Sequence, residues 1–248
     1  MHKNTIKFIK SLHLKKFRKE EALFLVEGEK SIMELVRSDF EILNIYLTQE
    51  MYDTYVGELR EYEHMIEIVS IADLERISTL EFNDTGLAVV KQKANTQLEV
   101  NDGELVLVLD DIRDPGNLGT IIRTADWYGV KKIVCSLTTA EVYNTKVIAA
   151  SMGSFTRVAV CYTELHIFLE NQKEKQIPIL GALLNGTDVH TFSYPQTGIL
   201  MMGNESNGIH ESLLPYITHK VTIPRYGNAE SLNVSMATGI ILDNWKRS

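Results

Sequence analysis

A series of short apolar runs, separated by stretches of helix length, limits the folds open to this chain. The run LVLVL at residues 105–109 is apolar throughout, and the strand-like stretches VKKIVCS, TRVAVCY, IPILGALL and GILMMGNE follow it along the chain. Strands without polar alternation are typical of parallel sheets that are buried on both faces. The stretches between them have helical periodicity. We therefore predict an open, mostly parallel α/β sheet with helices on both faces.

A second alternation of strand-like and helix-like segments fills the first hundred residues. The stretch ALFLVEGEKSIMELV predicts a strand, a Glu-Gly turn and a helix. The alternation gives way to polar residues, Asn and Gly at 93–104, KANTQLEVNDGE. Such a stretch is typical of a domain boundary. We predict a small α/β domain at residues 1–98, with a basic N-terminal arm, and a second domain at 105–248.

Several classes of protein are disfavoured by what the chain lacks. No apolar run reaches the roughly 18 residues of a membrane span, and the N-terminus has no apolar signal-peptide core. We therefore expect a cytoplasmic protein with no membrane partner. Cys135 and Cys161 lie in strand-like text and are predicted to be core thiols, and the seven histidines have no metal-ligand spacing. No metal is expected, and Trp127 and Tyr128 are interpreted as helix packing residues.

The net charge of −8 hides an uneven distribution. Residues 1–20 contain seven basic side chains and one acid, whereas residues 41–111 contain 16 acids and four basic side chains. A basic N-terminal segment can bind a phosphate backbone. The alternative, a solvated basic helix face, is equally compatible with the charges.

In open α/β sheets, ligands bind beyond the carboxyl ends of the strands. The first segment there is DDIRDPGNLGTIIRTA at residues 110–125, where Gly116 and Gly119 allow a tight turn. Asn117 lies in this loop, and Arg123 in the following helix can bring a planar cation to a phosphate. The alternative is a loop in which Asn117 caps the helix and Arg123 is a surface residue. The G-x-G-x-x-G order and the P-loop are both absent.

Two further loops place polar side chains after strands. In LMMGNESNGI, residues 200–209, Glu205 could hold another site residue or cap the next helix. In the segment from 223 to 242, IPRYGNAESLNVSMATGIIL, Ser231 could cap the last helix and Asn233 falls within its first turn. Backbone groups of such a loop can bind the edge of an adenine. The alternative is a capped helix packed on the sheet.

Taken together and in order, the three loops resemble a known family. The segments DPGNLGTIIRTA, GILMMGNESNGI and IPRYGNAESLNVSMA resemble the three motifs of the SpoU–TrmH family of RNA ribose 2′-O-methyltransferases, within the SPOUT superfamily. The resemblance covers about residues 105–248. The stretch FLVEGEKSIMELV is similar to the small substrate-binding domain that often precedes this catalytic domain. Arg225 departs from the pattern, since the family often has an apolar residue such as Met there.

This resemblance implies a fold and a site that the residue patterns alone do not. It implies a deep C-terminal trefoil knot, S-adenosylmethionine bound by the knot loops, and a homodimer with the site near its interface. The implied catalytic residues are Asn117, Arg123, Glu205, Ser231 and Asn233. The implied cofactor-binding residues are Leu183, Gly203, Asn204, Ile223, Pro224, Ser231 and Leu232.

The expected reaction is methyl transfer from S-adenosylmethionine to a ribose 2′-hydroxyl of RNA, with ribosomal RNA favoured over transfer RNA. Family accounts make the arginine of the first motif the base. Because a guanidinium is effectively always protonated, we expect Arg123 to stabilise the developing alkoxide and to hold the adjacent phosphate. The expected RNA-binding residues are Lys15, Lys16, Arg18 and Arg123.

Two other functions were weighed against methyl transfer. One is a non-catalytic RNA-binding or ribosome-assembly module on the same scaffold, which is disfavoured because every polar motif position is filled. The other is a nucleotide-dependent enzyme of the doubly wound type, which the missing glycine fingerprint disfavours. The modified nucleotide is not specified by the sequence.

Overall fold

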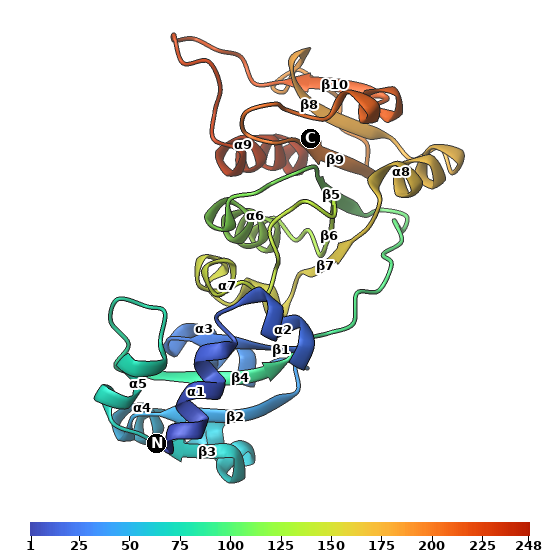
Figure 1. Cartoon of the computed structure of the whole chain (residues 1–248). Helices are drawn as coiled ribbons and strands as arrows, with labels where there is room; N and C mark the ends of the chain where they lie inside the picture. The colour runs from blue at the N-terminus through green and yellow to red at the C-terminus, as the bar shows by residue number, and fades with distance from the viewer. The chain divides into compact units, whose positions relative to one another are not determined.

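The computed structural model describes all 248 residues, which form two compact units (Figure 1). The first unit contains Met1–Ala94 together with Glu141–Thr156. The second contains Asn95–Ala140 together with Arg157–Ser248. Each unit has its own β-sheet. The segment 141–156, which the sequence pattern assigned to the second domain, thus packs within the first unit.

A four-stranded mixed sheet with the order β1-β4-β2-β3 organises the first unit. Both β1 and β2 pair antiparallel with β4, and β3 pairs parallel with β2. The strands are β1 (Leu23–Glu27), β2 (Ile42–Leu47), β3 (Ile66–Ile68) and β4 (Gly86–Lys91). The helices are α1 (Lys3–Ser11), α2 (Lys15–Glu21), α3 (Glu29–Val36), α4 (Gln49–Leu59), η1 (Arg60–Met65), α5 (Ile71–Ile77), α7 (Thr145–Ser151) and η2 (Ser154–Thr156). The predicted α/β layer is confirmed.

The returning segment 141–156 contributes to the core of the first unit. Ile148 and Phe155 are buried in the same apolar cluster as Phe24 and Phe40. The ring centroids of Phe24 and Phe155 are 6.0 Å apart, with an edge-to-face orientation. Burial of an aromatic side chain is worth roughly 1.5–3 kcal/mol relative to exposure. This unit therefore depends on both parts of the chain.

A six-stranded parallel sheet with the order β10-β8-β9-β5-β6-β7 organises the second unit. The strands are β5 (Leu105–Leu109), β6 (Lys132–Cys135), β7 (Ala159–Tyr162), β8 (Ile179–Asp188), β9 (Gly198–Met202) and β10 (His219–Thr222). The helices are α6 (Pro115–Trp127), α8 (Leu165–Glu174), η3 (Glu211–Tyr216) and α9 (Val234–Arg247). The predicted parallel α/β sheet is confirmed.

The central strands of this sheet are buried on both faces, as their composition predicts. Every residue of β5 and of β9 is buried. Val106 and Val108 share an apolar cluster with Phe168 of α8. Figure 1 shows α6 and α9 side by side, and the Tyr128 hydroxyl at the end of α6 donates a hydrogen bond of 3.3 Å to Asp243. The loops at the carboxyl ends of these strands are the ones that carry the sequence motifs.

Candidate active site

The helix α6, which follows the loop after β5, is capped by Asp114, so the side chain of Asn117 is free to bond to other loops. Asp114 is the N-cap residue of α6, and its Oδ1 accepts a hydrogen bond of 2.8 Å from the backbone N–H of Asn117. Pro115 occupies the first helical position, where its missing N–H costs nothing. The alternative in which Asn117 caps the helix is therefore wrong.

A chain of side-chain hydrogen bonds joins the three motif loops. Asn117 Nδ2 donates to Glu205 Oε1 at 2.7 Å, and Asn233 Nδ2 donates to Asn117 Oδ1 at 2.9 Å. Asn233 is the N-cap residue of α9, where its Oδ1 accepts from the backbone N–H of Ser235 at 2.9 Å. One amide group thus connects the loop after β9 to the start of the last helix.

The same bonds decide two alternatives that the sequence left open. Glu205 does not cap the next helix, because His210 is the N-cap residue of η3. Ser231 does not cap α9, because that helix begins at Val234 and Asn233 caps it. The carboxylate of Glu205 instead holds Asn117.

A tight turn after β9 presents Glu205. Asn204 and Gly208 exchange backbone hydrogen bonds of 3.0 and 2.9 Å. A Cβ added to Gly203 would lie 2.2 Å from the carbonyl carbon of Gly208, so only glycine fits there. Asn204 Nδ2 donates to the carbonyl of Asp111 at 2.8 Å, which ties this turn to the loop after β5.

Asp110 also connects these two loops, although the sequence analysis gave it no role. Its side chain is 6% exposed, and Oδ2 accepts a hydrogen bond of 2.8 Å from the backbone N–H of His210. Burial penalises the charged form and raises the pKa of the Asp110 carboxyl, while the bond from His210 acts in the opposite direction. A carboxylate directly after a buried strand was the signal that could have identified it.

Two of the five predicted catalytic residues lie outside the hydrogen-bonded group. Arg123 is exposed on α6, six residues after Asn117, which corresponds to roughly 9 Å along the helix axis. Ser231 is exposed in the segment that precedes α9. The structure therefore brings together Asn117, Glu205 and Asn233.

The predicted cofactor-binding residues lie on three neighbouring strands, β10, β8 and β9, or in the segments that follow them. Leu183 follows Gly181, the last residue of β8 that pairs with β9, and its carbonyl accepts a hydrogen bond of 2.5 Å from Thr222 Oγ1. Ile223 and Pro224, directly after β10, are half-buried.

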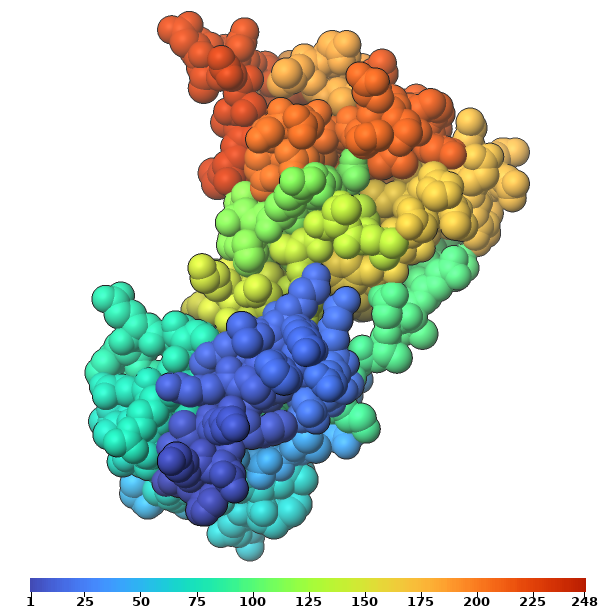
Figure 2. Space-filling model, viewed as in Figure 1, coloured from blue at the N-terminus to red at the C-terminus, as the bar shows by residue number.

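The segment 223–232 contains neither helix nor strand, and its backbone N–H groups donate no hydrogen bond within the chain. Figure 2 shows this segment, in deep orange, projecting from the second unit. Tyr226 within it is 94% exposed, and Leu232 is 50% exposed. Unpaired peptide groups of this kind suit an adenine edge, which offers both hydrogen-bond donors and acceptors. The residues present therefore fit S-adenosylmethionine.

Comparison with known proteins identifies the family. A model described as the SpoU rRNA Methylase family matches residues 104–243, more than half of the chain. The chain belongs to this family. A second model, described as the MRM3-like substrate binding domain, matches residues 3–88 of this chain.

Relatives of this SpoU methylase match it along most of their length. The 23S rRNA (guanosine(2553)-2′-O)-methyltransferase RlmP of Bacillus subtilis is 29% identical over 96% of this chain and 94% of its own length. The 23S rRNA (uridine(2479)-2′-O)-methyltransferase of Streptomyces viridochromogenes is 30% identical over 88% of this chain and 80% of its own length.

Solved structures have the same fold. A TrmH-family protein from Porphyromonas gingivalis is 33% identical, with a TM-score of 0.88 over 100% of this chain and 98% of its own. An AdoMet-bound rRNA methyltransferase from Sinorhizobium meliloti is 27% identical, with a TM-score of 0.88 over 99% of this chain and 95% of its own.

These matches confirm the predicted family, the α/β fold class and the predicted enzyme class, an RNA 2′-O-methyltransferase. The non-catalytic alternative is not favoured. The trefoil knot and the roles of individual residues stay predictions.

The basic N-terminal segment of the SpoU methylase is helical, but its arginine is not on the surface. Lys15 and Lys16 are exposed at the start of α2. Arg18 is 2% exposed, and its Nη2 pairs with Glu141 Oε2 at 2.7 Å. Its Nη1 donates to the carbonyls of Leu12 and His13. The prediction that Arg18 contacts RNA is therefore wrong, because its charge is used inside the first unit.

Other sequence predictions have mixed outcomes. Cys135 and Cys161 are free and buried, as predicted, and burial raises the pKa of both thiols. Trp127 is 84% exposed, so its interpretation as a packing residue within the chain is wrong. No group of three or more His, Cys, Asp or Glu side chains could hold a metal ion. None of the helices is long and apolar enough to cross a membrane.

Proposed function

We propose that this SpoU methylase transfers a methyl group to the 2′-hydroxyl of one ribose in ribosomal RNA. The observation that carries the proposal is the hydrogen-bond chain from Asn233 through Asn117 to Glu205, which joins all three family motifs. Relatives named as 23S rRNA 2′-O-methyltransferases support ribosomal RNA as the substrate. We therefore infer that 23S rRNA is the first RNA to test.

S-adenosylmethionine, when bound, supplies an electrophilic methyl group. The unpaired peptide groups of 223–232 would hold its adenine, with Ile223, Pro224 and Leu232 as apolar contacts. Gly203 and Leu183 would border the same site from the neighbouring strands. Arg225 would stand at its exposed rim, where the family often has an apolar residue.

The role of the hydrogen-bonded group is to fix the loops around the acceptor ribose. Asn117 accepts from one loop and donates to another, so a shift of either loop breaks a bond. Holding two reacting groups in line can supply roughly 7–11 kcal/mol of a barrier. Asn117 and Glu205 would contribute by positioning, and the exposed Ser231 hydroxyl would contact the nucleotide.

Arg123 would act as a fixed positive charge. A guanidinium stays protonated in proteins, so it can stabilise the alkoxide that develops on the ribose and bind the neighbouring phosphate. Its planar fork matches phosphate better than an ammonium group does. Its exposure leaves it accessible to RNA.

A homodimer would complete this surface. Trp127 on α6 is 84% exposed and Met236 on α9 is 62% exposed, although these helices pack together in one unit. Large exposed apolar side chains can belong to interaction sites. Arg123 lies four residues before Trp127, so both point to the same side of α6. A second copy on this face would therefore border the reaction site.

The experiment is transfer of a labelled methyl group from S-adenosylmethionine. The purified protein is incubated separately with ribosomal RNA and transfer RNA from cells that lack its gene, and digestion locates the label. Label on a ribose 2′-oxygen of ribosomal RNA is the expected result. Label confined to transfer RNA would overturn the substrate, and label on a base would overturn the reaction. Cofactor binding without methyl transfer to either RNA would overturn the proposed activity and support the non-catalytic RNA-binding module.

A further inference from the structure

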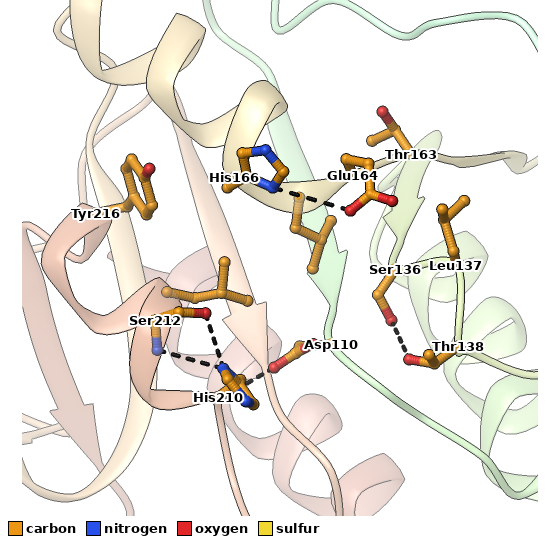
Figure 3. Close-up of a pocket in the computed structure, with 12 residues that line it drawn as sticks. Asp110, Ser136, Leu137, Thr138, Thr163, Glu164, His166, His210, Ser212 and Tyr216 are labelled. Atoms are coloured by element: carbon orange, nitrogen blue, oxygen red, sulfur yellow. Dashed lines mark hydrogen bonds and ion pairs between the residues drawn. The ribbon is translucent and has the colours of Figure 1, made fainter.

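A hollow in the second unit is lined by none of the proposed cofactor-binding residues. It has a volume of about 490 Å³ and lies at the carboxyl ends of β5, β6 and β7 (Figure 3). Its lining includes Asp110, Ser136, Leu137, Glu164, His210 and Tyr216. Small-molecule sites in proteins span roughly 300–1,000 Å³, so the hollow can take a nucleoside-sized group.

Two carboxylates, Asp110 and Glu164, are the groups of this lining that can only accept hydrogen bonds when ionised. The Asp110 side chain is 6% exposed, and only its Oδ2 is bonded within the chain, by the backbone N–H of His210. Oδ1 of Asp110 has no donor in the protein, yet the carboxylate lines the hollow. The hydroxyls of Ser136 and Thr138 can both donate and accept, and Ser136 Oγ already accepts from the backbone N–H of Asp111. A ligand that binds the Asp110 carboxylate must bring a hydrogen-bond donor to it.

Apolar and planar groups complete the lining. Leu137 is 57% exposed beside Ser136, and Leu165 and Leu213 are buried beneath the polar side chains. Figure 3 shows Tyr216 on one side of the hollow and Ser136, Leu137 and Thr138 on the other. The Lys173 ammonium lies 5.8 Å from the centre of the Tyr216 ring. The Tyr216 ring offers a surface on which a flat base can stack, and the neighbouring Lys173 ammonium is outside this lining.

This hollow is connected to the proposed reaction site through Asp110. Asp110 begins the loop that carries Asn117, and its bond to the backbone of His210 holds the loop that carries Glu205. A group bound to Asp110 would therefore contact a residue that joins these two loops.

We propose that this hollow binds an unpaired guanine of the RNA substrate, near the nucleotide that is methylated. The proposal rests on the proposed function, since it needs an RNA substrate. Guanine is the base that presents two neighbouring donors, N1–H and the 2-amino group, to a carboxylate. On adenine and cytosine one amino donor lies next to a ring-nitrogen acceptor, and on uracil one N–H donor lies between two carbonyl acceptors. Proteins commonly bind unstacked RNA bases by stacking and by contacts to this edge.

The test uses the full chain labelled with ¹⁵N and titrated with five nucleoside 5′-monophosphates: GMP, IMP, AMP, CMP and UMP. Backbone amide shifts of Ser136, Thr138, His210 and Ser212 report on the hollow. GMP is expected to bind with a Kd about tenfold or more below those of AMP, CMP and UMP. Its two donors can bond to Oδ1 and to the second lone pair of Oδ2, which also accepts from His210, and such a two-bond contact discriminates by about 1–3 kcal/mol. IMP, which lacks the 2-amino group, is expected to bind between GMP and AMP.

Substitutions tie the preference to one carboxylate. Asp110→Asn replaces an acceptor by a donor and is expected to remove the preference for GMP. Asp188→Asn makes the same chemical change at a residue outside this lining and is expected to keep it. If Asp110→Asn does not fold, Leu137→Trp at the exposed rim is expected to weaken GMP binding about tenfold by filling the hollow.

Three results would overturn the inference: no shift at these amides with any nucleotide, equal affinity for GMP and AMP, or an unchanged GMP preference in Asp110→Asn. Methyl transfer to ribosomal RNA is measured on the same protein. Transfer without GMP preference refutes the guanine site alone, whereas GMP preference without transfer refutes the proposed function alone.

Discussion

Replacing Asn117 by alanine tests the hydrogen-bond chain directly. The substitution removes a bond of 2.7 Å to the Glu205 carboxylate and a bond of 2.9 Å from Asn233. A bond to a charged group contributes about 1.5–3 kcal/mol and a neutral one about 0.5–1.5 kcal/mol. Asn117 and Glu205 are only half-buried and Asn233 is exposed, so water replaces part of both bonds. We use the lower ends of these ranges, about 2 kcal/mol in total.

A loss of about 2 kcal/mol from the transition state corresponds to a decrease of about 30-fold in kcat/KM. The assay is transfer of labelled methyl groups to ribosomal RNA, with thermal melting measured in parallel. Asn244→Ala is the matched control, because it removes one neutral bond of 2.9 Å to the Ile240 carbonyl elsewhere on α9. That control is expected to keep kcat/KM within about twofold, since its bond touches no motif loop.

The double variant Asn117→Ala with Glu205→Ala tests whether these two residues act together in the reaction. If Asn117 acts through Glu205, the double variant loses little more activity than the worse single variant. Additive losses would refute the coupling, and an Asn117→Ala enzyme within about twofold of the unmodified enzyme would refute the whole argument.

Four further predictions follow from individual side chains. Arg123→Ala should abolish transfer while S-adenosylmethionine binding, measured by calorimetry, stays within about twofold, and Arg123→Lys should not restore activity because an ammonium lacks the planar fork. Charge reversal of Lys15 and Lys16, both exposed, should weaken RNA binding and reduce the slope of log K against log salt by about 1–2, with the melting temperature unchanged. Gly203→Ala should cost about 1–3 kcal/mol of unfolding free energy, measured with denaturant, because its Cβ would overlap the Gly208 backbone at 2.2 Å. Burial raises the pKa of the Asp110 carboxyl above its usual value of 3.8, so the native state binds more protons there than the unfolded state does. The contribution of this group to stability therefore falls as pH rises through its folded pKa. The unfolding free energy of Asp110→Asn, taken relative to that of the unmodified protein, should increase over the same pH range.

The sequence predicted the parallel sheet better than it predicted the surfaces. Fully apolar runs such as β5 can only be buried on both faces, so the parallel sheet followed from composition. Polar residues directly after such strands had to meet at one edge, which is why Asn117 and Glu205 are bonded. The caps were harder to assign, because Asp114 and Asn233 compete with neighbouring polar residues for the same helix ends.

The other errors concern long-range partners and the exposure of side chains, which local sequence patterns do not reveal. Arg18 is buried because Glu141, more than a hundred residues later in the chain, neutralises it, and no count of local charges detects such a partner. Trp127 is a large apolar residue of the kind usually found in a core, yet its side of α6 is exposed. Asp110 does have a sequence signal, as a carboxylate directly after a buried strand, but the residue types do not reveal that its partner is the backbone N–H of His210.

The return of residues 141–156 to the first unit has a consequence for synthesis on the ribosome. Ile148 and Phe155 complete the apolar cluster around Phe24, so residues 1–94 emerge before their core is complete. At roughly 5–20 residues per second, the ribosome needs about 3–12 s to add the intervening segment. Until then Phe24 and Phe40 lack Ile148 and Phe155, two of the apolar partners in their cluster. The amino-terminal unit thus finishes folding only after translation of the catalytic unit is well under way.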